Sequence, residues 1–258
     1  MNSLSSILVT KPDPSICLLT LNRPEKRNAL NGPMIQEWMQ ALQKIADDAS
    51  IHVVILNGNG EHFCAGADMA WMQKMAQASH EENVNDALQL ARLLERIYTF
   101  PKPIIGLVHG AVMGGGLGVI ACCDMVIAAS NSVFCFPETK IGLTPSVISP
   151  YILSVMGERS ARYYFLTAES FDSHIATKLK LVQQIAPLEK LFDTGLMLAK
   201  NILKNSPHAL FEAKKITRHA VSEEKIKMTA EHLASMRTSR DAQEGLNAFL
   251  EKRSPVWE

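Results

Sequence analysis

The sequence predicts an α/β fold in which helices cover both faces of a sheet. Its predicted strands, residues 51–56 and 104–108 among them, are nearly continuous apolar runs instead of alternating apolar and polar residues. Strands of that kind are typical of a sheet that is buried on both faces. Runs with helical spacing separate the strands, and the pattern beyond Pro150 is mostly helical.

The composition fits this class and disfavours several others. The chain has 258 residues, of which 47% are hydrophobic and 20% charged, so it can bury a large core. Lys and Arg number 26, as do Asp and Glu, and this balance disfavours a nucleic-acid partner. The five cysteines form no CxxC pair and the histidines do not cluster, so we expect reduced thiols and no metal site. The pattern of a signal peptide, transit peptide or membrane span is missing, which predicts a cytoplasmic protein without a membrane partner.

The first part of the chain contains two predicted strands with a helix between them. Residues 15–22 form a short apolar strand. Asn31 is a predicted helix N-cap with Pro33 in the first turn, and apolar residues keep helical spacing to about residue 46. Residues 51–56 form the second strand, and the glycine- and asparagine-rich turn at 57–60 ends it.

The middle of the chain continues the alternation, and the end is helical. The predicted elements are, in order, helices over 69–75 and 82–98, a strand over 104–108, a helical run from the glycines at 114–116 to 123, strands over 125–128 and 132–136, and amphipathic helices over 188–203, 207–219 and 223–252. We place a soft domain boundary near Pro187. Residues 1–187 would form the α/β core and residues 188–258 a helical region.

The glycine stretch at Gly114–Gly116 is the first candidate site. Without side chains, the backbone N–H groups at a helix start can approach a phosphate or an oxygen that becomes negatively charged. Gly116 and Gly118 also match part of a dinucleotide-binding pattern, with Glu138 at the expected distance. The spacing from the preceding strand and a proline before Glu138 disfavour that interpretation. Tight packing of a glycine-lined helix is the structural alternative.

Two further features add to the site. Ala65, Gly66 and Ala67 run into a second helix start, where Asp68 alone would be an ordinary N-cap. Two converging N–H groups can form an oxyanion hole for a carbonyl oxygen. Glu138 follows an apolar strand, so burial should raise its pKa and suit it to general acid/base catalysis, although a solvated glutamate is the plainer alternative. Nucleophile-elbow, HExxH and Walker motifs are missing, and we expect Lys102, Lys140, Lys214 and Lys215 to be surface charges.

Four motifs together resemble the enoyl-CoA hydratase/isomerase (crotonase) family along essentially the whole chain. They are LNRPEKRNAL at 21–30, FCAGAD at 63–68, HG with GGG at 109–116 followed by CD at 123–124, and FPE with GL and P at 136–145. The resemblance implies a spiral of ββα repeats with a C-terminal helical part that trimerises. It also implies assembly as homotrimers or homohexamers.

The resemblance implies a site for an acyl-CoA substrate, in which coenzyme A is part of the substrate and no separate cofactor is needed. The N–H groups of Ala67 and Gly115 would bind the thioester carbonyl, with Glu138 as the catalytic acid/base. Residues assigned to substrate binding are Lys26, Arg27 and Ala29 in the loop at 26–29, Ala65, Asp68 and Met69 near the second helix start, the glycines Gly114 and Gly118, and Phe249 and Lys252 in the tail.

One departure from the family pattern matters for the reaction. Hydratases of the family commonly carry two catalytic glutamates, and here Gly118 stands at the first position. A single Glu138 also suits an enoyl-CoA Δ3,Δ2-isomerase. A subunit that binds acyl-CoA without catalysis is a third possible function. The segments at 64–75, 138–151 and 162–172 resemble bacterial methylglutaconyl-CoA hydratases of leucine breakdown, a subgroup that tends to lack the first glutamate. We therefore predict a hydratase acting through an enolate, with Lys140 as a candidate cation for a second carboxylate on the substrate.

Overall fold

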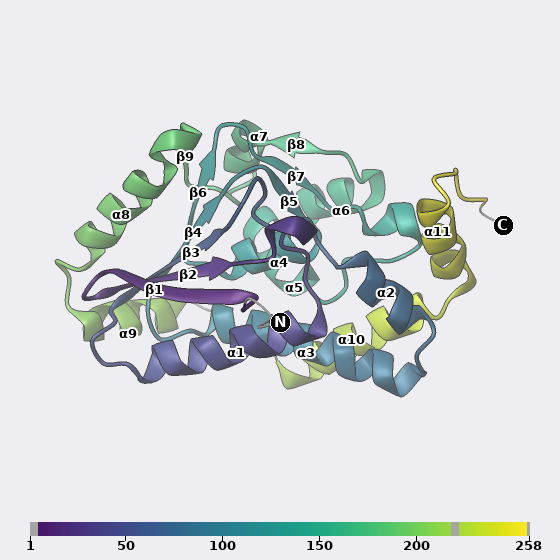
Figure 1. Cartoon of the computed structure of the whole chain (residues 1–258), viewed down its shortest axis with the longest axis horizontal. Helices are drawn as coiled ribbons and strands as arrows, with labels where there is room; N and C mark the ends of the chain where they lie inside the picture. The colour runs from purple at the N-terminus through teal and green to yellow at the C-terminus, as the bar shows by residue number, and fades with distance from the viewer. Residues whose placement is uncertain (1–4, 218–221, 257–258) are drawn as a thin grey trace.

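The computed structural model describes residues 5–217 and 222–256. Its main sheet has six strands in the order β1-β2-β3-β4-β6-β9 (Figure 1). The first pair is antiparallel and each later pair is parallel. The strands are β1 (Ile7–Asp13), β2 (Ile16–Leu21), β3 (Val53–Gly58), β4 (Ile104–Val108), β6 (Met125–Ala129) and β9 (Gln184–Ala186).

Both faces of the inner strands of this sheet are buried, which explains their continuous apolar sequences. Side chains of a strand alternate between its two faces. On one face, Val53 and Ile55 of β3 pack in a core with α8 (Leu191–Ile202). On the other face, Val54 and Leu56 belong to the larger core formed with α1 (Gly32–Asp47) and α3 (His80–Tyr98). Figure 1 shows α8 and α1 on opposite sides of the strands.

A second, three-stranded sheet carries the parts of the chain that surround the glycines. It consists of β5 (Ala111–Met113), β7 (Val133–Cys135) and β8 (Phe171–Asp172) in that order. β5 and β7 are parallel, so their carboxyl ends, Met113 and Cys135, lie side by side. β5 leads through Gly114 into α4 (Gly115–Cys122), and β7 leads to a 3-10 helix, η2 (Glu138–Ile141). The glycines and Glu138 therefore begin from neighbouring strand ends.

The remaining helices surround these two sheets. In chain order they are η1 (Pro24–Lys26), α2 (Met69–Ala76), α5 (Ser149–Met156), α6 (Glu158–Thr167), α7 (Ser173–Lys178), η3 (Leu188–Lys190), α9 (Pro207–Thr217), α10 (Glu223–Arg237) and α11 (Arg240–Leu250). No helix in the described part of the chain combines the length and apolarity needed to cross a membrane.

The buried core continues across the boundary that we placed near Pro187. Leu191 and Ala199 of α8 pack against the main sheet, and Ile226 and Ala230 of α10 belong to the larger core. α10 also packs along α3, so the C-terminal helices cover elements of the first half of the chain. The division into residues 1–187 and 188–258 stays a prediction, and no strand occurs after β9 in the residues described.

Local signals predicted most elements well, including the strand over 104–108 and two helix starts. The Asn31 side chain accepts a hydrogen bond from the N–H of Met34 at the start of α1. Asp68 accepts from Ala70 and Trp71 at the start of α2. The predicted helix over 223–252 is wrong in one respect, because Ser239 caps a new helix there. Residues 218 and 219 of the predicted helix over 207–219 lie outside the described chain.

The surface position expected for Lys214 is wrong. Its side chain is 9% exposed, and its Nζ bonds the Asp124 carboxylate at 2.6 Å and the Lys102 carbonyl at 2.8 Å. Asp124 in turn accepts from the N–H of Ile104 at the start of β4. Lys102 is also engaged, since it donates to the carbonyls of Ile45 and Asp48. A lysine beside a second lysine carries no local signal of burial, because its partner lies far away in the sequence.

Candidate active site

The start of α4 presents a free backbone donor at Gly115. Gly114, its N-cap, has a φ of 46°, and its own N–H donates to the Cys135 carbonyl at 3.0 Å, which ties the turn to β7. The first N–H groups of a helix have no partner within it. The Gly115 N–H therefore points out of the helix start with no acceptor in the described chain. It carries the positive end of the helix dipole with it.

A second free donor lies at Ala67. Leu30 and Ala67 form an isolated parallel bridge, in which the Leu30 N–H donates to Gly66 and the Leu30 carbonyl accepts from Asp68. This bridge uses the groups on either side of Ala67 and leaves the Ala67 N–H outside the ladder. Leu30 also touches the other donor, since a Cβ at Gly115 would lie 3.0 Å from Leu30 Cδ1. The two N–H groups therefore flank the same leucine.

Both donors open into one cavity, together with Glu138. Its lining is mostly apolar and comes from α1, α2 and the segments before them, α3, α4, η2, the segment after η2 and α10. The lining residues are Leu30, Asn31, Ile35, Ala67, Trp71, Met72, Asp86, Leu90, Gly115, Glu138, Leu143, Thr144, Pro145, Ser146, Val147, Ile148, Leu233 and Arg237. A mostly apolar cavity with a few converging polar groups is the usual form of a small-molecule site.

Glu138 has the environment of an acid/base group. Its Oε2 is buried with no hydrogen-bond partner in the described structure, and Oε1 lies against Gly114, where a Cβ would come within 3.0 Å. Burial raises the pKa of Glu138 from 4.5 to about 7, because the charged form loses its hydration. A carboxyl group with such a pKa can both accept and donate a proton near neutral pH.

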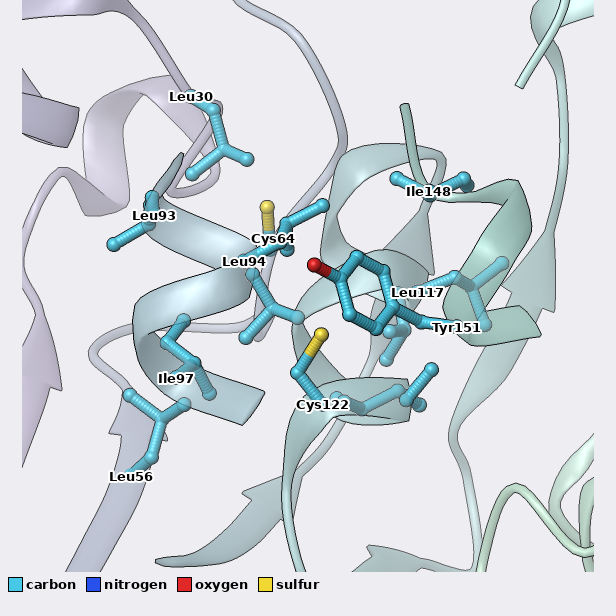
Figure 2. Close-up of a cluster of buried hydrophobic side chains, with 14 of the residues drawn as sticks. Leu30, Leu56, Cys64, Leu93, Leu94, Ile97, Leu117, Cys122, Ile148 and Tyr151 are labelled. Atoms are coloured by element: carbon cyan, nitrogen blue, oxygen red, sulfur yellow. The ribbon is translucent and has the colours of Figure 1, made fainter. Parts of the chain in front are cut away.

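The site leaves no room for a second carboxylate at position 118. Gly118 is buried in α4, and a Cβ there would lie 2.3 Å from Cγ2 and 2.8 Å from Cβ of Ile148. Figure 2 shows Ile148 in the same buried apolar cluster as Leu94 of α3 and Leu117 of α4. Gly118 is not among the cavity-lining residues. Close packing of α4 is the visible role of this glycine.

Four of the residues predicted to bind substrate lie in two adjoining loops next to the cavity-lining residues Leu30 and Ala67. They are Lys26, Arg27, Ala29 and Ala65. The N–H of Ala65 donates to the Arg27 carbonyl at 3.0 Å, which joins the loop at 26–29 to the approach to Ala67. Asn28 fixes this loop, since its fully buried amide donates to the carbonyls of Asn59 and His62 at 2.8 Å each. Their binding of substrate stays a prediction.

The other predicted substrate-binding residues are placed variously. Asp68 caps α2 and pairs with Arg23 at 2.8 Å, so both of its oxygens are used within the protein. Met69 packs against the small cluster around Leu143 and Leu246. Phe249 is 56% exposed, and Lys252 and Lys140 are exposed too. Lys140 follows Glu138 in η2, not in a strand, and lies outside the cavity lining.

Comparisons with known proteins agree with this architecture. A family model described as enoyl-CoA hydratase/isomerase matches residues 12–258. The chain is 31% identical over 254 residues to the 2,3-dehydroadipyl-CoA hydratase of Escherichia coli, covering 97% of this chain and 98% of the relative. The chain belongs to the enoyl-CoA hydratase/isomerase family.

Two further matches extend along nearly the whole chain. One is the mevalonyl-coenzyme A hydratase of Aspergillus fumigatus, with 32% identity over 262 residues, or 99% of this chain and 96% of the relative. The other is the crystal structure of an enoyl-CoA hydratase from Shewanella pealeana, with 39% identity and a TM-score of 0.80. That match covers 99% of this chain and 97% of the solved chain. The fold is the crotonase spiral of ββα repeats with C-terminal helices, and the chain is an enzyme of the enoyl-CoA hydratase type.

Sequence reasoning missed several polar residues of the enoyl-CoA hydratase cavity. Asp86 bonds both Arg237 and Trp71 in the cavity lining, which also includes Thr144 and Ser146. Arg237 and Asp86 are 151 positions apart, so no spacing in the sequence pairs them. The described residues also contain no group of three or more His, Cys, Asp and Glu placed to hold a metal ion.

Proposed function

We propose that this enzyme hydrates 3-methylglutaconyl-CoA in the breakdown of leucine. One observation carries the hydratase chemistry: the unpartnered carboxyl oxygen of Glu138 shares a cavity with the free N–H groups of Ala67 and Gly115. The two donors suit the thioester oxygen, and burial raises the pKa of Glu138 beside them to about 7.

The chemistry follows from these three groups. The Glu138 carboxylate takes a proton from water as the water oxygen bonds to Cβ, and the electrons of the double bond move toward the thioester. The resulting enolate oxygen is stabilised by the N–H groups of Ala67 and Gly115, which become stronger partners as charge develops. Glu138 then returns the proton to Cα, so one carboxyl group completes the addition of H and OH.

The assignment of 3-methylglutaconyl-CoA as the substrate is supported by sequence resemblance. The segments at 64–75, 138–151 and 162–172 resemble bacterial methylglutaconyl-CoA hydratases. The Escherichia coli relative is named for 2,3-dehydroadipyl-CoA, whose acyl group also ends in a second carboxylate. A substrate with a carboxylate at the far end of the acyl group is therefore the proposal.

An enoyl-CoA Δ3,Δ2-isomerase is the second candidate. It is favoured by the packing of Gly118 against Ile148. Among the described lining residues the carboxylates are then Glu138 and Asp86, and Asp86 is already engaged by Trp71 and Arg237. An isomerase moves one proton between two carbons and needs no bound water. A subunit that binds acyl-CoA without turning it over is the remaining alternative, and it would need neither the free Glu138 oxygen nor its raised pKa.

A substrate panel separates these functions. We would assay 3-methylglutaconyl-CoA, crotonyl-CoA and a 3-enoyl-CoA with the unchanged enzyme, with Glu138→Gln and with the surface control Glu61→Gln. We expect hydration of 3-methylglutaconyl-CoA with the highest kcat/KM, lost by orders of magnitude in Glu138→Gln and unchanged in Glu61→Gln. Turnover of the 3-enoyl ester alone would establish the isomerase. Binding of all three esters without turnover would establish the non-catalytic subunit.

We also propose a cytoplasmic homotrimer or homohexamer, as the family resemblance implies. Large apolar side chains are exposed on the outside of the chain, Leu166 at 73% and Met197 at 60% among them, and such side chains are candidates for subunit contacts. Light scattering coupled to gel filtration gives the mass directly. A monomer at micromolar concentration would refute this assembly.

A further inference from the structure

One wall of the acyl-CoA cavity contains a buried ion pair that the hydration chemistry does not use. Arg237, the last residue of α10, donates from Nη1 to Oδ2 of Asp86 on α3 at 2.6 Å. The two side chains are only 12% and 10% exposed. Both residues line the same cavity as Glu138.

Asp86 holds the Arg237 guanidinium in place, and both of its carboxylate oxygens accept hydrogen bonds from the protein. Its Oδ1 accepts the indole N–H of Trp71 at 2.9 Å, while Oδ2 holds Arg237. Asp86 is therefore a positioning residue. It sets the orientation of Arg237 and balances its charge while the cavity is empty of substrate.

Arg237 keeps donors that the protein does not use. Its Nε is buried without an acceptor among the described residues. Nε and Nη2 form one edge of a guanidinium, and Nη1, the atom held by Asp86, lies outside that edge. A carboxylate matches such an edge with two parallel hydrogen bonds. A buried donor without a partner is unfavourable, so a ligand that supplies the acceptor gains affinity.

The other lining residues also favour a carboxylate as the partner of Arg237. Leu30, Ile35, Leu90, Leu143 and Leu233 surround the space with hydrocarbon, and Arg237 is the only cation among the described lining residues. A simple hydrocarbon acyl chain would contact the apolar wall and leave the Arg237 edge unpaired. Lys140, the cation considered from sequence, is exposed and outside the cavity.

We propose that Arg237 binds a carboxylate at the far end of the acyl group, so the enzyme selects enoyl-CoA thioesters of dicarboxylic acids. This proposal rests on the hydratase function proposed above and assigns its specificity to the ion pair of α10 and α3. Asp86 and Trp71 hold the guanidinium in place for that contact.

The test compares two substrates in several variants of the full-length enzyme. The readout is the ratio of kcat/KM for 3-methylglutaconyl-CoA to kcat/KM for 3-methylcrotonyl-CoA, which lacks the second carboxylate. We expect Arg237→Gln to lower this ratio about 100-fold, the order expected for losing a charge-assisted pair of hydrogen bonds. Arg237→Lys should restore part of the ratio, because it keeps the charge without the two-donor edge.

Arg92→Gln is the matched control. Arg92 also joins α3 to α10, through Glu223, but this pair is outside the cavity lining. Its loss should leave the ratio unchanged. If Arg237→Gln fails to fold because Asp86 is left unpaired, the double variant Asp86→Leu/Arg237→Met removes both charges, and the ratio should fall equally.

The possible results separate a failure of the proposed carboxylate site at Arg237 from a failure of the proposed hydratase function. An equal loss of kcat/KM for both esters in Arg237→Gln would show a structural role and overturn the carboxylate site. Preference of the unchanged enzyme for 3-methylcrotonyl-CoA would overturn it as well, with hydration intact. Failure of the unchanged enzyme to hydrate either ester would instead refute the hydratase proposal.

Discussion

Replacing Glu138 by Gln should stabilise the protein against unfolding, and the gain should grow with pH. Burial raises the pKa of Glu138 from 4.5 to about 7 in the folded chain. Between those values the unfolded chain ionises and the folded one does not, so the wild-type protein loses stability as pH rises through about 7. Stability that depends on this group is fully present only below about pH 4.5.

The size of the effect follows from that difference. A shift of about 2.5 pH units at about 1.4 kcal/mol per unit gives a cost of about 3.5 kcal/mol above pH 8. A Gln side chain stays neutral and avoids this cost. The free energy of unfolding of Glu138→Gln relative to wild type should therefore increase by about 2 to 3 kcal/mol between pH 5 and pH 8.5.

Urea unfolding at fixed protein concentration, at pH 5 and at pH 8.5, measures this difference. Glu61→Gln is the control, because Glu61 is exposed and should show no such growth with pH. A difference between Glu138→Gln and wild type that is the same at both pH values would refute the reasoning. It would mean that the carboxylate is hydrated or paired in solution.

Substitutions of Gly115, Gly118 and Lys214, two of them with a matched control, test other parts of the structure. Gly115→Pro removes one of the two proposed oxyanion N–H groups at a helix position that tolerates proline, and kcat should fall about 10²- to 10³-fold, whereas Gly115→Ala, which keeps the N–H, should retain much more activity in the same assay. Gly118→Glu should add no hydratase activity and should destabilise the fold by about 1 to 3 kcal/mol in urea unfolding, since its Cβ has no space; unchanged stability would contradict the packing. Lys214→Met should cost about 3 to 5 kcal/mol, because it removes the cation from the partly buried Asp124 carboxylate, while Lys215→Met should cost almost nothing; equal losses in thermal or urea unfolding would argue against the buried pair.

Local signals predicted the elements that position the free N–H groups of Ala67 and Gly115. The helix start at Gly115 and the cap at Asp68 can be predicted from a few consecutive residues, because the residues next to a helix start determine which of its N–H groups stay free. The strands β5, β8 and β9 were missed, since each has only two or three residues and its pairing partner lies elsewhere in the chain. β1 was missed as well, because most of its residues are exposed and it lacks the apolar run of the inner strands.

By itself, the sequence determined the α/β class, the family, the two helix starts and the carboxylate at Glu138, because each depends on residues close together or on motifs in a fixed order. Only the tertiary structure decided what surrounds them. It brought the carboxyl ends of β5 and β7 together, buried Oε2 of Glu138 while placing Oε1 against Gly114, and packed Ile148 where a side chain at Gly118 would stand. It also paired Arg237 with Asp86 across 151 positions. Contacts of that separation depend on how helices pack on the sheet, and no local pattern records them.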